Sequence, residues 1–239
     1  MNPVEKLSLQ IFGCQECELS SLPHRGPVPF VMGTSNIAVV SEAPGSHEVA
    51  EGRPLCGPSG RLLDRWLGQA GIDPASVSRF NVVSCYPAGP PSPDHLWSCR
   101  HNLQSQIEVL APRYLLVLGK VAFSRFHSLP IATARGHWWA EGATYCMTTW
   151  HPSFVARDGT GVAAKEAAAD ILLFATGTRL VGPDGFPVGR STCAVCNGSS
   201  TRRGYKSILL CDTCDTAETL LERHFGGCEE TAPTPSSAP

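Results

Sequence analysis

The chain has 239 residues, of which 42% are hydrophobic and 17% are charged. This length allows one or two domains, and this apolar fraction supports a sizeable core. No run of about 18 apolar residues occurs, and the first residues lack the pattern of a secretion signal. We therefore expect a cytoplasmic protein without membrane contact. A net charge of −2 argues against a strongly basic nucleic-acid coat protein, but not against an enzyme that touches DNA through one patch.

The predicted elements alternate between helices and strands. A helix is expected first, over 3–12. A buried strand is expected over 36–41, and further strands over 79–84, 114–118 and 144–149. Further helices are expected over 60–67, 94–110, 120–126 and 163–174. Ser59 is the expected N-cap of the helix at 60–67, and Gly71 its stop signal. This alternation predicts an α/β fold of three layers (αβα), with a mostly parallel sheet at the centre.

Three loops rich in glycine and polar residues follow predicted strands, at 42–60, 84–93 and 151–157. Ligands of parallel sheets bind beyond the carboxyl ends of the strands. We therefore expect one pocket built from three separate loops.

The organisation of the chain changes after the last predicted helix. We expect one domain over 1–176, a linker over 177–190, a small cysteine module over 191–217 and an acidic, then disordered, tail over 218–239. No internal repeat is evident.

The small module carries two CxxC pairs, Cys193/Cys196 and Cys211/Cys214. Four thiolates at this spacing are typical of a zinc ribbon, although idle thiols or bound iron are alternatives. The chain has 11 cysteines and no secretion signal, so metal binding is favoured over disulfides. Basic residues within 190–206 would allow a further nucleic-acid or protein contact, and solvated charge is the alternative.

Four more cysteines precede the linker: Cys14, Cys17, Cys85 and Cys99. A CxxC pair with two distant cysteines fits either zinc or an iron–sulfur cluster. Their spacing does not decide between the two.

Several short motifs occur in order between about residues 10 and 176. They are Ser41-Glu-Ala-Pro-Gly-Ser-His-Glu48, Gly52-Arg-Pro-Leu-Cys-Gly57 with Gly60, Asn81-Val-Val-Ser-Cys85, Leu118-Gly119, Arg135-Gly136 and Thr149-x-His151-Pro-Ser-Phe-Val-Ala-Arg157. Together they resemble the signature of family 4 uracil-DNA glycosylases. The resemblance implies an enzyme that flips a base out of DNA and hydrolyses its N-glycosidic bond, with uracil as the leading substrate. No lysine stands in a matched motif, so we expect a monofunctional enzyme.

The resemblance implies roles for three polar residues. Glu42 would orient water or stabilise positive charge on the sugar, and a loop cap is the alternative. His151 would donate a hydrogen bond to the base oxygen that becomes negative, and a structural hydrogen bond is the alternative. Asn81 offers a donor and an acceptor that match a pyrimidine edge, and bracing of a loop is the alternative.

The same resemblance assigns the surroundings of the base and the DNA. Glu48 would line the pocket and exclude bulky bases, beside Pro44, Gly45 and Leu55. Contacts to the DNA backbone would come from Ser153, Arg157 and Arg135. Phe154 or Val155 would wedge into the duplex, and core packing is the alternative.

A [4Fe–4S] cluster is the cofactor that the resemblance implies for Cys14, Cys17, Cys85 and Cys99, and it is preferred over zinc on that ground. The zinc ribbon has no counterpart in the usual family pattern. We expect DNA as the partner and a monomer.

The chain departs from the family pattern around the pocket. Leu55 stands where the family has a phenylalanine, Cys56 replaces an aliphatic residue, and the loop after Cys85 lacks two basic residues. A bulkier modified pyrimidine, such as a hypermodified cytosine of phage DNA removed in antiviral defence, is therefore an alternative substrate. A non-catalytic DNA-binding adaptor is a further alternative.

Overall fold

The computed structural model describes residues 1–182 and 185–189, together with the backbone of 202–203 and 209–210. The predicted zinc ligands Cys193, Cys196, Cys211 and Cys214 lie outside the described residues, as does the tail. Within the predicted ribbon, β6 (Arg202–Arg203) pairs antiparallel with β7 (Leu209–Leu210).

A five-stranded sheet forms the centre of the first domain, in the order β2-β1-β3-β5-β4. The strands are β1 (Ile37–Ser41), β2 (Ser78–Asn81), β3 (Tyr114–Leu118), β4 (Trp138–Glu141) and β5 (Thr144–Thr149). All neighbours pair in parallel except β4 and β5, which form an antiparallel edge. The predicted mostly parallel sheet is therefore confirmed, while β4 was not anticipated.

The register of the sheet brings the carboxyl ends of four strands to one edge. Ser41 is paired with Asn81 across β1 and β2, and Leu118 with Thr149 across β3 and β5. The loops that follow these strands therefore start close together, as the sequence predicts.

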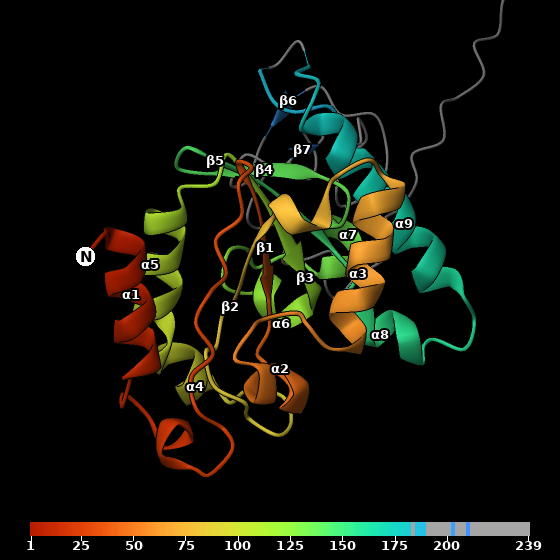
Figure 1. The fold of residues 1–239 in the computed structure, drawn as a ribbon. Helices are drawn as coiled ribbons and strands as arrows, with labels where there is room; N and C mark the ends of the chain where they lie inside the picture. Colours follow the sequence, from red (N-terminus) through yellow and green to blue (C-terminus); the bar gives the residue numbers. More distant parts are fainter. Residues whose placement is uncertain (183–184, 190–201, 204–208, 211–239) are drawn as a thin grey trace, which may run out of the picture.

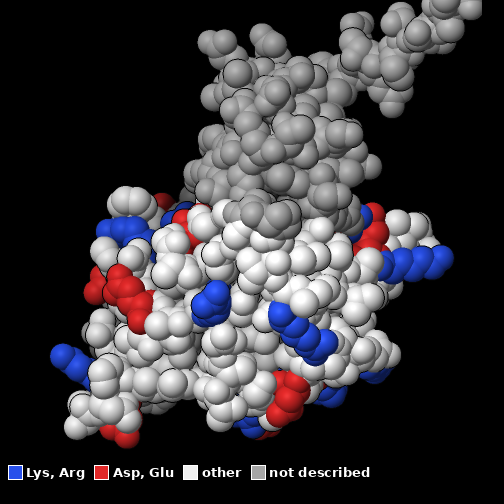
Figure 2. Space-filling view, turned by 90° about the horizontal axis from the view of Figure 1, so that it is seen from above, with Lys and Arg blue, Asp and Glu red and all other residues white. Residues whose placement is uncertain are grey.

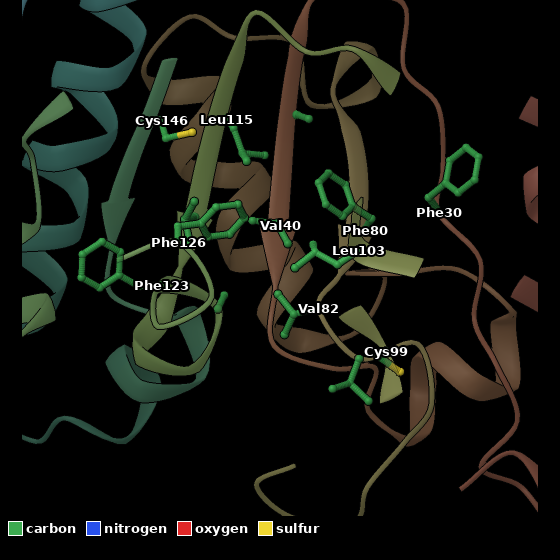
Figure 3. Packing of buried hydrophobic residues seen from close by; sticks show 14 of the residues in the cluster. Phe30, Val40, Phe80, Val82, Cys99, Leu103, Leu115, Phe123, Phe126 and Cys146 are labelled. Carbon is green, nitrogen blue, oxygen red and sulfur yellow. The ribbon is translucent and has the colours of Figure 1, made fainter. Parts of the chain in front are cut away.

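Helices cover both faces of the sheet (Figure 1). One face packs against α1 (Pro3–Phe12), α5 (Arg100–Leu110), α6 (Gly119–Phe123) and α7 (Ile131–Ala134). Figure 3 shows part of the core on this face, with Val40 of β1, Phe80 of β2 and Leu103 of α5 among its labelled side chains. The other face packs against α3 (Pro58–Gln69), α8 (Pro152–Arg157) and α9 (Val162–Gly177). The three αβα layers are therefore confirmed.

Some predicted boundaries are wrong for local reasons. The helix expected over 94–110 is two helices, α4 (Pro93–Ser98) and α5, because the helix is interrupted at Cys99, which caps both. The helix expected from residue 60 is α3, which starts at Pro58 with Gly57 as its cap instead of Ser59. Proline suits the first turn because its missing N–H has no partner there.

Several short elements lie in segments that were expected to be loops. They are η1 (Glu18–Ser21), α2 (Ser46–Glu51), η2 (Pro74–Ser76) and α8 (Pro152–Arg157). Of these, α2 and α8 have a direct bearing on the pocket, because α2 follows the loop after β1 and α8 carries Ser153 and Arg157.

Charged groups are scattered over the face seen from above in Figure 2. Basic and acidic side chains alternate there with uncharged ones, and the described part of this face has no continuous basic area. Among the described residues, no helix has the length and apolar character that crossing a membrane requires.

Candidate active site

A cavity of about 470 Å³ lies at the carboxyl ends of the strands. All three predicted loops contribute to it. Its lining is Ser41, Glu42, Ala43, Pro44, Gly45, Glu48, Leu55, Ser59, Asn81, Tyr86, Pro87, Gly89, Pro90, Val121, His151, Ser153 and Arg157. The size falls within the range of small-molecule sites, roughly 300–1,000 Å³. Every residue expected to catalyse or to bind the base thus lines one pocket.

Asn81 ends β2 at the base of the pocket. Its side chain is buried, with 3% of the residue exposed, and neither its amide nitrogen nor its amide oxygen has a hydrogen-bond partner among the described residues. A buried polar group without a partner costs about 1–3 kcal/mol. Such a group in a pocket wall indicates a ligand that supplies the missing donor and acceptor.

His151 precedes α8 and is held in one orientation by two serines. Its Nδ1 accepts a hydrogen bond from the backbone N–H of Ser153 at 3.1 Å. Its Nε2 lies 2.9 Å from the Oγ of Ser41. Burial, together with the charge of Arg157, lowers the pKa of His151 to about 4. The imidazole is therefore neutral at pH 7.

Gly119 leaves the space that His151 needs. A Cβ at this glycine would lie 2.8 Å from the Cβ of His151, and its backbone has a φ of +84°. Only glycine adopts this conformation readily and avoids the clash. The glycine of the Leu118-Gly119 motif is therefore required so that His151 can occupy its position.

Glu42 follows β1 and is half-buried at the pocket. Burial raises the pKa of its carboxyl group, and the charge of Arg157 acts in the opposite direction. Its carboxylate has no hydrogen bond to another described residue, in contrast to Glu48. It is therefore free to meet a water molecule or a positively charged sugar.

Glu48 connects two pocket loops. Its carboxylate accepts hydrogen bonds from the backbone N–H groups of Gly45, at 3.0 Å, and Gly57, at 2.8 Å. A Cβ on either glycine would lie within 2.8 Å of this carboxylate. Glu48 thus holds the start of α2 against the start of α3, in addition to lining the pocket as expected.

Leu55 is buried in the pocket wall with an unusual backbone. Its φ of +53° is rare for a residue with a branched side chain. Its carbonyl accepts a hydrogen bond from Arg79, whose guanidinium also pairs with Asp64 at 2.5 Å. Backbone strain of this kind, typically about 1–3 kcal/mol, gathers at functional sites.

Tyr86 was not anticipated as a site residue, although it directly follows Cys85. It is the one aromatic residue in the described lining of the pocket. Arg25 lies over its ring at 5.7 Å and donates a hydrogen bond to the carbonyl of Pro87. The sequence contained one signal for this residue, because Tyr86 is an aromatic side chain inside the predicted pocket loop at 84–93.

The expected DNA contacts separate into two groups. Ser153 and Arg157 line the pocket, and Phe154 next to them is 45% exposed. Val155 is 7% exposed and belongs to the core below α8, which does not fit a wedge. Of the two residues expected as a wedge, Phe154 is the exposed one.

Arg135 does not fit the expected contact with DNA. The residue is 8% exposed, and its guanidinium is bound by the carboxylates of Asp170 and Glu166. A phosphate would have to displace these carboxylates from the interior. Its charge therefore serves the packing of α9 against the sheet.

The four N-terminal cysteines come from three parts of the chain: the segment after α1, the loop after β2 and the break between α4 and α5. Burial and the neighbouring cysteines raise the pKa of Cys85 to about 12, and burial raises that of Cys99 to about 11. The charges of Cys14 and Cys17 contribute to both increases. Among the described residues, however, no group of three or more His, Cys, Asp and Glu side chains is arranged to hold a metal ion.

Comparison with known proteins agrees with this fold and site. The pocket lies at the strand ends of an αβα sheet, where α/β proteins bind their ligands. The family model for the uracil DNA glycosylase superfamily matches residues 29–172. The chain belongs to this superfamily.

Within this superfamily, the chain is similar to several type-4 uracil-DNA glycosylases. The chain is 32% identical over 180 residues to the type-4 uracil-DNA glycosylase of Thermotoga maritima, which covers 70% of this chain and 91% of that protein. It is 29% identical over 171 residues to the type-4 enzyme of Sulfurisphaera tokodaii, covering 64% and 76%. It is 30% identical over 128 residues to the type-4 enzyme of Archaeoglobus fulgidus, covering 51% and 62%.

Proposed function

We propose that this protein is a monofunctional DNA glycosylase that flips uracil out of DNA, hydrolyses its N-glycosidic bond and leaves an abasic site. The unpartnered amide of Asn81 in the pocket carries this proposal. The edge of a pyrimidine presents the acceptor and the donor that this amide lacks. Membership of the superfamily and the names of the type-4 relatives support uracil as the base.

The proposed reaction breaks the bond between the sugar and the base. The electron pair of this bond leaves with the base, and the sugar becomes positively charged until water adds to it. The added water releases a proton to the solvent, and the departed base takes one up from the solvent. Glu42 stabilises the sugar and orients the water. Neutral His151 supplies, through its Nε2–H, part of the stabilisation of the negative charge that develops on the base. A preorganised donor of this kind is typically worth about 10²–10³ in rate.

Contacts with the DNA backbone surround the pocket in this proposal. Arg157 and Ser153 bind phosphates beside the flipped nucleotide. Phe154 fills the space that the base leaves. Its ring is exposed and directly follows Ser153, which binds the backbone beside the flipped nucleotide. Its ring packs on Trp150, with 5.0 Å between centroids, which holds it in place.

A [4Fe–4S] cluster is proposed for Cys14, Cys17, Cys85 and Cys99. Two of these thiols are buried beside other cysteines, where a thiolate is costly unless a metal cluster shares its charge. The chemistry of the donor set therefore fits the cluster. When bound, it would tie the segment after α1 to α5 and the loop after β2 as a structural unit.

The division of the chain into domains is also part of the proposal. Residues 1–176 form the glycosylase domain, 177–190 a linker, 191–217 a zinc ribbon and 218–239 a tail. Zinc would be held by Cys193, Cys196, Cys211 and Cys214, and the ribbon would offer a further nucleic-acid or protein contact. We place the protein in the cytoplasm as a monomer that acts on DNA.

A second candidate function is excision of a bulkier modified pyrimidine, for example in defence against phage DNA. It is favoured by the aliphatic wall that Leu55 gives to a cavity of about 470 Å³. A flat ring is absent at this position of the wall, and a larger base would find room there.

The test offers purified protein a panel of oligonucleotides with uracil or other bases, together with modified phage DNAs. Released bases are identified, and abasic sites are revealed by alkali. Release of uracil is expected, with strand breaks only after alkali because the enzyme is monofunctional. Glu42→Gln and His151→Ala should each lose most of the activity while binding DNA. Release of a larger base alone would favour the second candidate, and DNA binding without any release would favour an adaptor.

A further inference from the structure

We propose that Ser41 supplies the hydrogen bond that reaches the departing base, with His151 acting behind it. This inference rests on the proposed glycosylase function and assigns a catalytic role to a residue at the end of β1. Ser41 is 1% exposed, and it lines the pocket beside Glu42.

The hydrogen bonds of His151 fix the direction of this contact. A backbone N–H can only donate, so the N–H of Ser153 requires a lone pair on Nδ1 of His151. A neutral imidazole with a lone pair on Nδ1 carries its hydrogen on Nε2. The Oγ of Ser41, at 2.9 Å from this nitrogen, is therefore the acceptor.

The hydroxyl group of Ser41 then has its own hydrogen left to donate. Within the described part of the chain, the contact with His151 is the only hydrogen bond recorded for this hydroxyl. Since Ser41 lines the pocket and is in register with Asn81, its hydrogen is available to the same ligand that Asn81 binds. The base would thus meet the amide of Asn81 and the hydroxyl of Ser41.

Two hydrogen bonds in series suit a leaving group that gains negative charge. Nε2–H of His151 polarises the hydroxyl of Ser41, which strengthens the bond that the hydroxyl donates. No proton is transferred, because the electron pair of the broken bond remains on the base and both donors keep their hydrogens. The interaction is stronger in the transition state than in the bound substrate, as catalysis requires.

The first experiment compares Ser41→Ala with the wild type in single-turnover release of uracil and of 5-fluorouracil from matched oligonucleotides. The fluorine makes the second base a better leaving group, which needs less stabilisation. Ser41→Ala should slow release of uracil about 10²-fold and release of 5-fluorouracil much less, with DNA affinity unchanged. Ser41→Thr keeps the hydroxyl and should retain most of the rate.

A matched control is Ser78→Ala on the neighbouring strand. Ser78 is also buried, and its hydroxyl accepts from the N–H of Gly33 away from the pocket. This variant should lose stability without a selective loss on uracil. It separates removal of any buried serine from removal of the one beside His151.

The second experiment tests whether Ser41 and His151 act as one unit. The double variant Ser41→Ala/His151→Ala should be no slower than His151→Ala alone, because groups that act in series are not additive. Nitrogen NMR of wild-type His151 should find the hydrogen on Nε2. Equal rates for Ser41→Ala and the wild type, equal losses on both bases, or a hydrogen on Nδ1 would each overturn the inference. A wild-type protein that releases neither base would overturn the proposed function itself, and with it this role.

Discussion

Arg135 and Asp170 form a buried ion pair in which one guanidinium nitrogen lies 3.0 Å from both carboxylate oxygens. Asp170 is fully buried in α9 and also accepts from the hydroxyl of Thr149 at 2.9 Å. The pair therefore joins α9 to the end of β5, two residues before His151.

Arg135→Ala should lower the free energy of unfolding by about 3–5 kcal/mol, because it leaves the Asp170 carboxylate buried without its cation. Denaturant unfolding measures this loss. Arg125→Ala removes an exposed arginine and should change stability by less than about 0.5 kcal/mol. If Arg135→Ala instead left stability intact and reduced the salt dependence of DNA binding, Arg135 would be a phosphate contact after all.

Asn81→Ala should separate stability from activity. Removing an amide that has no partner should leave the free energy of unfolding unchanged or raise it by about 1 kcal/mol, since the desolvation cost disappears. The value of kcat/KM for uracil release should fall at least about 10²-fold, because two hydrogen bonds to the base are lost. A large loss of stability would indicate that Asn81 braces the loop instead.

The pH dependence of base release should follow Glu42. Its carboxyl group must be ionised to stabilise the sugar, and burial raises its pKa above the ordinary 4.5. Activity should therefore fall as the pH drops through this raised value, while His151 stays neutral down to about pH 4. Arg157→Gln should move the acid limb to higher pH, because the guanidinium opposes the rise. An unchanged limb in this variant would remove Arg157 from the electrostatics of the site.

Leu55→Phe should distinguish the two candidate substrates. An aromatic ring stacked on a base is worth roughly 1–3 kcal/mol, so release of uracil should rise about tenfold if uracil is the substrate. If the pocket serves a larger base, the ring should occupy needed space and release of that base should fall. Leu55→Met keeps an aliphatic side chain and serves as the control. No change with either base would mean that residue 55 does not face the flipped base.

Metal analysis tests the cysteine assignments. Protein purified without oxygen should be brown and contain about four iron atoms and one zinc ion per chain, as one [4Fe–4S] cluster and one ribbon require. Cys85→Ser should remove the iron and retain the zinc. Colourless protein with two zinc ions would contradict the iron–sulfur assignment.

Much of the fold follows from local patterns, whereas the details of the site depend on contacts between distant residues. The apolar run at 114–118 and the run of threonine, tyrosine, cysteine and methionine at 144–149 predict β3 and β5 to the residue. The edge strand β4 is shorter, with only three apolar residues before Glu141. The link between Ser41 and His151 joins residues 110 positions apart, and no spacing rule reveals it.

Arg135 illustrates the same limit. A motif can indicate that an arginine belongs to a family pattern. Its partners Glu166 and Asp170 lie 31 and 35 positions away, and no spacing rule pairs them with Arg135. The sequence therefore identifies Arg135 as a motif residue but does not reveal the carboxylates that bind it.

The strand order has a consequence for the growing chain. β3 lies between β1 and β5, and its five residues are all buried in the finished sheet. Until residues 144–149 leave the ribosome, one edge of β3 has no partner, and an open apolar edge invites pairing with other chains. A polypeptide interrupted before this point would lack His151 and expose that edge, so it would be inactive and prone to aggregate at the same time.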